Sequence, residues 1–348
     1  MNTRVVNVSI LLLLVFAVAS GLGSFLVGEA DGRWLFWLHR AGGLALVVLL
    51  AWKVGIATRS YRKRGVTAGT ALSAVGGVLL LGSLATGLLW ATAGLGRVPV
   101  PIFGSWTVLS LHVALSMLLI PLFLAHLGLR WPRPSRVDLL GRHAALRMLG
   151  LLAAGFVVWG AQEFLSALVA PSASSRRFTG SREEGSFAGN GHPVTNWLSD
   201  PIPRIEADRW QLRIHGEVES ESTLSYEEVL TFDDAVREAT LDCTGGWYTV
   251  QRWSGVSVDA LLERAGIKSG AGSLLFHSST GYARRFSLEE AGELLLATHV
   301  EDEMLSAGHG FPLRLVAPGY RGYAWVKWVA ELEVSRDPAW LEAPLPLQ

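Results

Sequence analysis

The stretch LDCTGGWYTVQRW, residues 241–253, contains Cys243, the only cysteine in a chain of 348 residues. A single cysteine excludes an internal disulfide, and it excludes a zinc or iron–sulfur site built only from thiolates of this chain. Three interpretations remain for a thiol that lies between a turn-forming Thr-Gly-Gly and several tryptophans. It is a small buried hydrophobe, a nucleophile, or one ligand of a metal whose other ligands come from elsewhere.

The composition divides the chain into two parts. Half of the residues are hydrophobic, only 17% are charged, and the mean hydropathy is +0.34, which suggests a membrane protein. The formal net charge is zero, so nothing points to a nucleic-acid partner. We therefore expect an all-α transmembrane bundle of five helices in residues 1–170, a flexible linker in residues 171–186, and a mixed α+β domain in residues 187–348.

Five apolar stretches are long enough to cross the core of a lipid bilayer, which takes roughly 20 residues. They cover residues 7–27, 34–57, 66–93, 105–129 and 146–170. A signal peptide is the alternative for the first stretch, but no convincing small-residue cleavage site follows it. The sequence therefore predicts a multi-pass protein of the cell membrane.

The short loops predict the orientation of these helices. Residues 58–65 and 130–143 are rich in arginine, whereas residues 28–33 and 94–104 carry one arginine each. Positively charged loops remain on the cytoplasmic side. Five crossings then place the C-terminal domain outside the cytoplasm.

Three histidines lie in two of the predicted helices, where ionisable side chains are costly and usually functional. His39 and His112 lie at similar depth from the outer side, and His126 follows fourteen residues after His112. Two histidines at one depth can hold a b-type haem, and packing histidines are the alternative. The pattern resembles the membrane cytochromes b and the ferric-reductase-like haem proteins. It implies one haem on His39 and His112 and leaves open a second one that involves His126.

The inner side departs from that resemblance. Fourteen residues after His39 stands Lys53, which is more simply a lysine that reaches towards the cytoplasmic phosphates. Lys53 or His143 as a ligand of a second haem is the weaker interpretation.

The C-terminal part has the pattern of strands with a few short helices. Alternating or apolar runs predict strands in residues 209–218, 273–279, 312–318 and 328–334, and capped runs predict helices in residues 225–232 and 257–266. No glycine-rich dinucleotide motif or phosphate loop is present in the sequence. This pattern indicates a mixed α+β domain that is large enough to hold its own core.

Three segments carry a resemblance to a known family. LDCTGGWYTVQRWSGVSVDALLERAG (241–266) resembles the cofactor segment of the sulfite oxidase family of molybdenum enzymes, which includes the periplasmic methionine sulfoxide reductases. GHGFPLRLVAPGYRGYAWVKWVAELEV (308–334) and FAGNGHPVTNW (187–197) are similar to two further segments of that family. The matches stand in the family's order and cover residues 187–336.

The resemblance implies a molybdenum–molybdopterin cofactor. The dithiolene of the cofactor would supply two sulfurs, and Cys243 would be the thiolate ligand of molybdenum and the catalytic residue, which explains why one cysteine is sufficient. The resemblance also implies a set of cofactor-binding residues. They are Asn190, His192, Ser278, His309, Arg314, Trp325, Val326 and Lys327. Trp247, Trp253, Trp325 and Trp328 are expected to form walls and core.

Together these features predict a membrane-anchored oxidoreductase that transfers an oxygen atom to or from a small oxyanion or sulfoxide. A b-type haem would relay electrons to or from the quinone pool or another membrane electron carrier. Arg284, Arg285 and Arg321 are candidates to attract an anion, and Tyr320 or Tyr323 is a candidate proton donor. The alternative is a redox sensor or scaffold that retains the fold without the metal.

Overall fold

The structure, a computed structural model, describes residues 3–93, 96–100, 104–130, 134, 136, 141–169, 176–196, 200–232 and 234–344. The chain divides into two compact units. One contains Met1–Ser24 and Ala30–Gly180, and the other contains Phe25–Glu29 and Ser181–Gln348.

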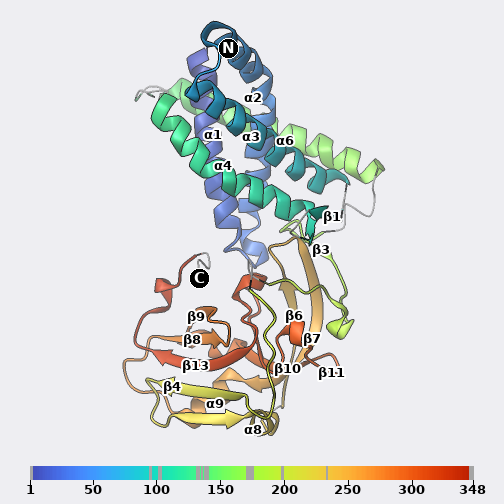
Figure 1. The fold of residues 1–348 in the computed structure, drawn as a ribbon, viewed down its shortest axis with the longest axis vertical. Helices are drawn as coiled ribbons and strands as arrows, with labels where there is room; N and C mark the ends of the chain where they lie inside the picture. Colours follow the sequence, from blue (N-terminus) through green and yellow to red (C-terminus); the bar gives the residue numbers. More distant parts are fainter. Residues whose placement is uncertain are drawn as a thin grey trace. The chain divides into compact units, whose positions relative to one another are not determined.

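The first unit is built from long helices (Figure 1). They are α1 (Thr3–Ser24), α2 (Trp34–Arg64), α3 (Ala68–Ala93), α4 (Val108–Arg130) and α6 (Arg142–Val169), with η1 (Ala30–Gly32) before α2 and a hairpin of β1 (Arg97–Val100) and β2 (Gly104–Thr107) before α4. These five helices are long and apolar enough to cross a membrane. They correspond to the five stretches expected from the sequence.

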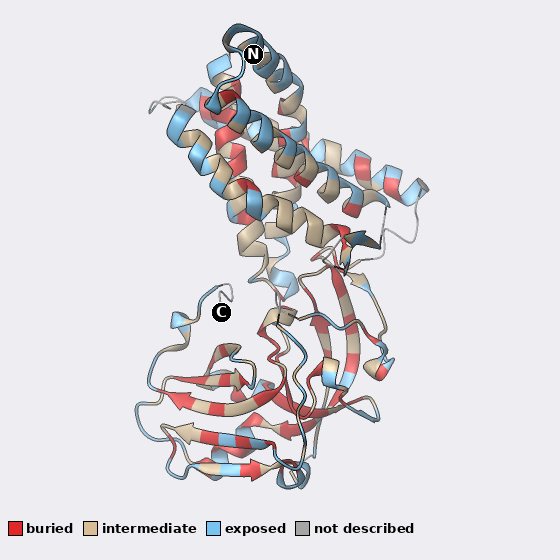
Figure 2. Ribbon diagram, in the orientation of Figure 1, coloured by how far each residue is buried: buried red, intermediate tan, exposed pale blue. Residues whose placement is uncertain are grey.

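The helices are apolar on their inner and outer faces. Inside the unit, α1 packs against α2, and Leu13 and Leu46 are fully buried. Outside, Leu149, Val157 and Phe164 of α6 remain exposed, as do apolar residues of the other helices (Figure 2). A helix that is apolar all round is typical of a membrane span or of the core of a large protein.

The second unit contains two mixed sheets (Figure 1). The first comprises β3 (Arg182–Glu183), β6 (Ala235–Asp242), β7 (Trp247–Ser257), β10 (Leu295–Val300), β11 (Glu303–Met304) and β12 (Arg314–Val316). The second has the order β5 (Ser222–Ser225), β4 (Gln211–Gly216), β13 (Val329–Ser335), β8 (Ser273–Ser278) and β9 (Ala283–Ser287). The helical segments are η2 (Gly189–Gly191), α8 (Tyr226–Leu230), α9 (Val258–Ala265), η3 (Leu288–Glu293), η4 (Ala307–His309), η5 (Gly322–Ala324) and η6 (Ala339–Leu341).

The predicted α+β pattern is confirmed in this unit. Each of the four predicted strands overlaps an observed one (β4, β8, β12 and β13), and the two predicted short helices overlap α8 and α9. Ser225 starts α8 with a complete capping box, in which its side chain and that of Glu228 bond reciprocally to backbone N–H groups. Ser257 starts α9 but makes no side-chain capping hydrogen bond.

Parts of the stretch expected to be a linker make specific contacts in the structure. Arg176 donates to both carboxylate oxygens of Glu163, at 2.9 and 3.0 Å. Arg182–Glu183 form β3, which pairs in parallel with the start of β7. The part of this linker prediction that covers residues 171–175 lies outside the described residues.

One hydrophobic core joins both sheets of the second unit. Trp253, Phe276, Phe286 and Leu332 are buried in it, and the Trp253 and Trp325 rings meet edge to face at 5.6 Å between centroids. Figure 2 shows that buried residues run along most of the strands. These strands and their core hold the loops that form the candidate site.

Candidate functional site

The hairpin of β6 and β7 places Cys243 in a tight turn. Asp242 pairs with Tyr248 at the end of the ladder, the Cys243 N–H donates to the Trp247 carbonyl at 2.9 Å, and the Gly246 N–H donates to the Cys243 carbonyl at 3.0 Å. Gly246 has φ +94°, a conformation that glycine adopts without a Cβ clash. The turn therefore requires a glycine three residues after the cysteine.

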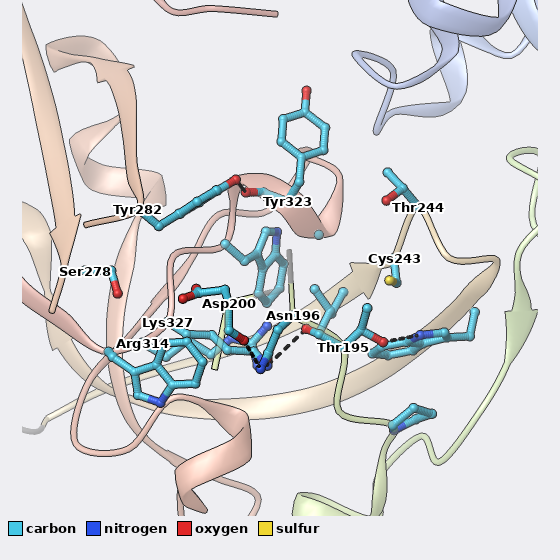
Figure 3. Close-up of a pocket in the computed structure, with 16 residues that line it drawn as sticks. Thr195, Asn196, Asp200, Cys243, Thr244, Ser278, Tyr282, Arg314, Tyr323 and Lys327 are labelled. Carbon is cyan, nitrogen blue, oxygen red and sulfur yellow. Dashed lines mark hydrogen bonds between the residues drawn. The ribbon is translucent and has the colours of Figure 1, made fainter. Parts of the chain in front are cut away.

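A pocket lies beside this turn, and the Cys243 side chain points into it (Figure 3). Its empty volume is about 680 Å³, including space open to solvent. Other described residues around it are Pro193, Thr195, Asn196, Asp200, Leu241, Thr244, Trp247, Ser278, Tyr282, Arg314, Gly322, Tyr323, Trp325, Lys327 and Trp328.

Arg314 brings a buried positive charge to the pocket. Its guanidinium donates to the His309 carbonyl at 3.1 Å and lies over the Trp253 and Trp325 rings, at 5.1 and 5.7 Å from their centroids. Its Nε has no hydrogen-bond partner among the described residues. Burial lowers the pKa of Arg314 to about 9.

Lys327 brings a second positive charge. Its Nζ donates to the Gly308 carbonyl at 2.6 Å, to the Asn196 side chain at 2.8 Å and to the Thr195 carbonyl at 3.1 Å, so these three hydrogen bonds go to neutral oxygens. Burial first, and then repulsion by Arg314, lowers the pKa of Lys327 to about 7. The pocket therefore holds two cations in an environment that disfavours their charge.

This charge distribution fits an anionic cofactor. A buried charge is costly unless it is paired and hydrogen-bonded, and a phosphate supplies both the opposite charge and the acceptors. Burial also raises the pKa of the Cys243 thiol, while the Gly245 N–H and Arg321 act in the opposite direction. Binding of a metal by the thiolate would overcome the cost of deprotonation. The residues present thus fit a group that carries both a thiolate-binding metal and a phosphate.

The predicted site residues separate into two sets. The pocket brings together Cys243, Ser278, Arg314, Trp325 and Lys327. Asn190, His192, His309 and Val326 are not among the described residues that line the pocket. The four tryptophans are buried, which confirms their expected role in walls and core.

Asn190 holds loops together in the structure. Its side-chain amide donates to Glu303 at 3.0 Å and to the Met304 carbonyl at 2.8 Å, and its Oδ1 accepts from the Ser306 N–H at 2.8 Å. Both the nitrogen and the oxygen of the Asn190 side-chain amide are therefore hydrogen-bonded within the protein. Val326 is fully buried, and its carbonyl accepts from the Leu315 N–H at 2.8 Å.

The His192 and His309 rings pack against each other with centroids 4.1 Å apart and their planes tilted by 53°. His309 is hydrogen-bonded to the Ser306 hydroxyl at 2.7 Å and to the His192 carbonyl at 2.9 Å, while His192 is bonded to the Gly189 carbonyl at 2.7 Å. Burial first, with repulsion from Arg314, lowers the pKa of His192 to about 3; burial lowers that of His309 to about 4. This neutral pair supports the turn at Gly308–His309, whose carbonyl groups accept hydrogen bonds from Arg314 and Lys327.

Tyr282 is a pocket residue that the sequence patterns did not indicate. Its hydroxyl donates to the Tyr323 carbonyl at 2.5 Å, and burial raises its pKa far above the ordinary value. It stands four residues after Ser278, just beyond the turn between β8 and β9. That short spacing from a predicted site residue is the signal that could have found it. Tyr323 also lines the pocket, whereas the Tyr320 hydroxyl donates to Glu290.

The arginines expected to attract an anion each have an acidic partner. Arg284 lies 2.7 Å from Glu342, and Arg285 lies 3.5 Å from Asp337. Arg321 lies 3.6 Å from Asp242 and is buried with it. Their charges are therefore already countered within the chain.

In the helical unit, the His39 and His112 rings meet with centroids 6.0 Å apart. Each Nδ1 is bonded to a backbone carbonyl, that of Ala17 at 3.0 Å for His39 and that of Ser83 at 2.7 Å for His112. The Nε2 atom is thus the nitrogen of each ring that is left for a metal.

His126 and Lys53 do not join that pair. The His126 ring is bonded to the Ser73 hydroxyl at 3.2 Å, and Lys53 donates to the Asn7 side chain at 2.9 Å. His143 is exposed in the first turn of α6. The structure brings together the first haem pair expected from the sequence, but it assembles no comparable pair around His126 in the described residues.

Comparison with known proteins identifies the class of the C-terminal unit. Residues 199–340 match the family model of the oxidoreductase molybdopterin binding domain. The chain is also 30% identical over 132 residues to the uncharacterized oxidoreductase YuiH of Bacillus subtilis. The match covers 37% of this chain and 67% of that protein. The chain belongs to the oxidoreductases that carry this molybdopterin-binding domain.

Two further proteins are similar to part of this chain. The chain is 28% identical over 172 residues to nitrate reductase (NADH) 1 of Phaseolus vulgaris. The match covers 39% of this chain and 20% of that enzyme. A solved structure, the sulfane dehydrogenase SoxCD of Paracoccus pantotrophus, is 26% identical with a TM-score of 0.41, covering 44% of this chain and 45% of that one. The chain thus spans only a fifth of the plant enzyme that it matches.

Proposed function

We propose that this protein is a membrane-anchored molybdenum oxidoreductase that transfers an oxygen atom to or from a small substrate beside Cys243. A b-type haem on His39 and His112 would exchange the electrons with the quinone pool. The observation that carries the catalytic part is the pocket itself, in which one thiol faces a cavity that is also lined by the buried Arg314 and the half-buried Lys327.

The residues of the pocket have distinct roles in this proposal. Arg314 and Lys327 bind the cofactor phosphate through charge-assisted hydrogen bonds. Cys243 supplies a thiolate ligand, and Trp325 and Trp328 form walls that limit access of water. The bound molybdenum cofactor supplies oxygen-atom transfer and two-electron exchange.

The helical unit supports the electron-transfer part. A metal–imidazole bond is about 2 Å long, as it is for zinc, so an iron between two facing rings needs ring centres roughly 6 Å apart. The observed 6.0 Å between the His39 and His112 rings agrees with that requirement. Gly21 and Gly87 accommodate the rings, because a Cβ would lie 3.0 Å from His39 and 2.9 Å from His112.

Membrane anchoring is supported by the apolar outer faces of the five helices. The arginine-rich loops 58–65 and 130–143 favour a cytoplasmic location for those ends, which would place the molybdopterin domain outside the cytoplasm.

Sulfoxide reduction is the favoured reaction, and sulfite-type oxidation is the second candidate. The observation that separates them is the pairing of Arg284, Arg285 and Arg321 with carboxylates. Each ion pair is neutral, so it attracts an anionic substrate only weakly. Near Cys243 the pocket is lined by Thr244, Trp247 and other uncharged groups, which suit a neutral substrate. A screen of sulfoxides with reduced dyes and of sulfite with oxidised dyes reports substrate class and direction together.

Metal analysis tests the catalytic proposal. The full chain, expressed in a host that makes molybdopterin, should contain molybdenum in proportion to protein, and Cys243→Ser should lose it. A wild-type protein that is folded but free of molybdenum would support the alternative, a sensor or scaffold that retains only the fold.

A further inference from the structure

Arg321 lies against the backbone of the turn that carries Cys243. Its Nη2 donates to the Cys243 carbonyl at 3.2 Å and lies 3.6 Å from the Asp242 carboxylate. Both side chains are buried, with exposed fractions of 5% and 3%. The same two residues form an isolated parallel bridge between their backbones. The loop that follows β12 is thus attached to the cysteine turn by both its backbone and a charged side chain.

The Asp242 carboxylate is fixed from a second direction. The Ser181 hydroxyl donates to it at 2.6 Å, and Ser181 and Asp242 are both buried. On the other side, Gly322 allows the loop to approach, since a Cβ there would lie 3.2 Å from the Cys243 Cα. The side chains of Ser181, Asp242 and Arg321 are therefore held in one geometry next to the turn that carries the thiol.

Such an ion pair is an unusual way to stabilise a turn. Taking two charges out of water is expensive, and well-packed apolar residues often stabilise a fold equally well. Groups around a metal ligand, however, orient the ligand and adjust the reduction potential of the metal by their charge and hydrogen bonds. Arg284, in contrast, is buried but pairs with the half-buried Glu342 and donates to the Ala343 carbonyl, away from the cysteine turn.

We infer that Arg321 and Asp242 are positioning residues that hold the Cys243 turn and set the reduction potential of the metal bound to its thiolate. This inference rests on the proposed function, because it requires the molybdenum ligand to be Cys243. The positive charge of Arg321 favours the reduced metal, and the negative charge of Asp242 opposes it. The two charges together keep the potential at an intermediate value.

The test is the midpoint potential of molybdenum in the full-length, cofactor-loaded protein, followed through its Mo(V) EPR signal. Asp242→Asn should raise the potential, because Arg321 then acts without its counter-charge. Arg321→Gln should lower it, because Asp242 remains. The double variant should return close to the wild-type potential. Arg285→Gln, at an arginine that is paired with Asp337 away from the turn, is the matched control and should leave the potential unchanged.

Arg321→Lys keeps the charge and provides the second measurement if Arg321→Gln does not fold or load metal. Its potential should lie nearer to wild type than that of Asp242→Asn. The inference is overturned if Asp242→Asn and Arg321→Gln shift the potential in the same direction, or if Asp242→Asn leaves the potential and the Mo(V) spectrum unchanged. A metal-free wild type would instead contradict the proposed function, so the two failures are distinguishable.

Discussion

Arg314 and Lys327 donate to the carbonyl oxygens of two consecutive residues, His309 and Gly308, at 3.1 and 2.6 Å. The two cations are therefore attached to one turn although they lie on different segments of the chain. Gly310 makes this approach possible, because its φ is +114° and a Cβ there would lie 3.0 Å from the Arg314 Cβ. We interpret this turn as the element that directs both charges at the same anion.

Removing either cation should weaken cofactor binding. A hydrogen bond to a charged group contributes about 1.5–3 kcal/mol, so Arg314→Met or Lys327→Met is expected to lower cofactor affinity by about 10- to 100-fold. The measurement is molybdopterin and molybdenum per chain after dialysis. Lys268→Met, at an exposed lysine, is the control. Full retention of cofactor in both pocket variants would contradict the assignment of the phosphate site.

The buried pair of His192 and His309 predicts an acid-sensitive domain. Their pKa values in the folded protein, about 3 for His192 and about 4 for His309, lie below the ordinary 6.5, so below pH 6.5 the unfolded chain binds more protons. The free energy of unfolding should then fall as the pH falls from about 6.5 to 4, by at most about 1.4 kcal/mol per pH unit for each histidine.

Denaturant unfolding, followed by tryptophan fluorescence of the full chain in detergent, measures that slope. His309→Asn should reduce it, because this variant lacks one of the two histidines with a lowered pKa. An equal slope in wild type and His309→Asn would rule out this origin for the acid sensitivity.

The haem assignment predicts a difference between three histidines. His39→Ala and His112→Ala should each abolish the low-spin b-type signal in the oxidised-minus-reduced spectrum, because each removes an axial ligand. His126→Ala is the matched control on the same helix as His112 and should retain the signal. A signal that persists in the first two variants would end the assignment, and loss of the signal in His126→Ala would call for a second haem.

Asn190 should affect stability more than cofactor binding. Its side chain joins the η2 turn to Met304 and Ser306, so Asn190→Ala leaves a backbone N–H and a carbonyl without their partners. The free energy of unfolding is expected to fall by about 1–3 kcal/mol while molybdenum content is retained. A stable variant that has lost its molybdenum would place Asn190 at the cofactor after all.

The organisation of the chain could be predicted from its sequence, because hydrophobic pattern reports burial directly. Apolar runs near 20 residues marked the helices α1, α2, α3, α4 and α6, and alternation marked strands such as β4 and β13. The β6–β7 hairpin was missed as a pair of strands, although it places Cys243. Adjacent polar residues, Arg237-Glu238 in β6 and Gln251-Arg252 in β7, interrupt the alternation, and the turn chemistry of the cysteine segment was the more visible signal.

The sequence by itself determined which kinds of residue are available: one soft thiolate, two cations near the end of the chain, and two histidines at one depth of a helical bundle. Only the tertiary structure decided which of them share a site. Arg314 and Lys327 reach the Cys243 pocket through strand pairing and buried turns, while the same packing directs Asn190 towards Glu303 and pairs Arg321 with Asp242. The physical reason is that each buried polar group must find a partner, and that partner is set by contacts between segments far apart in the chain.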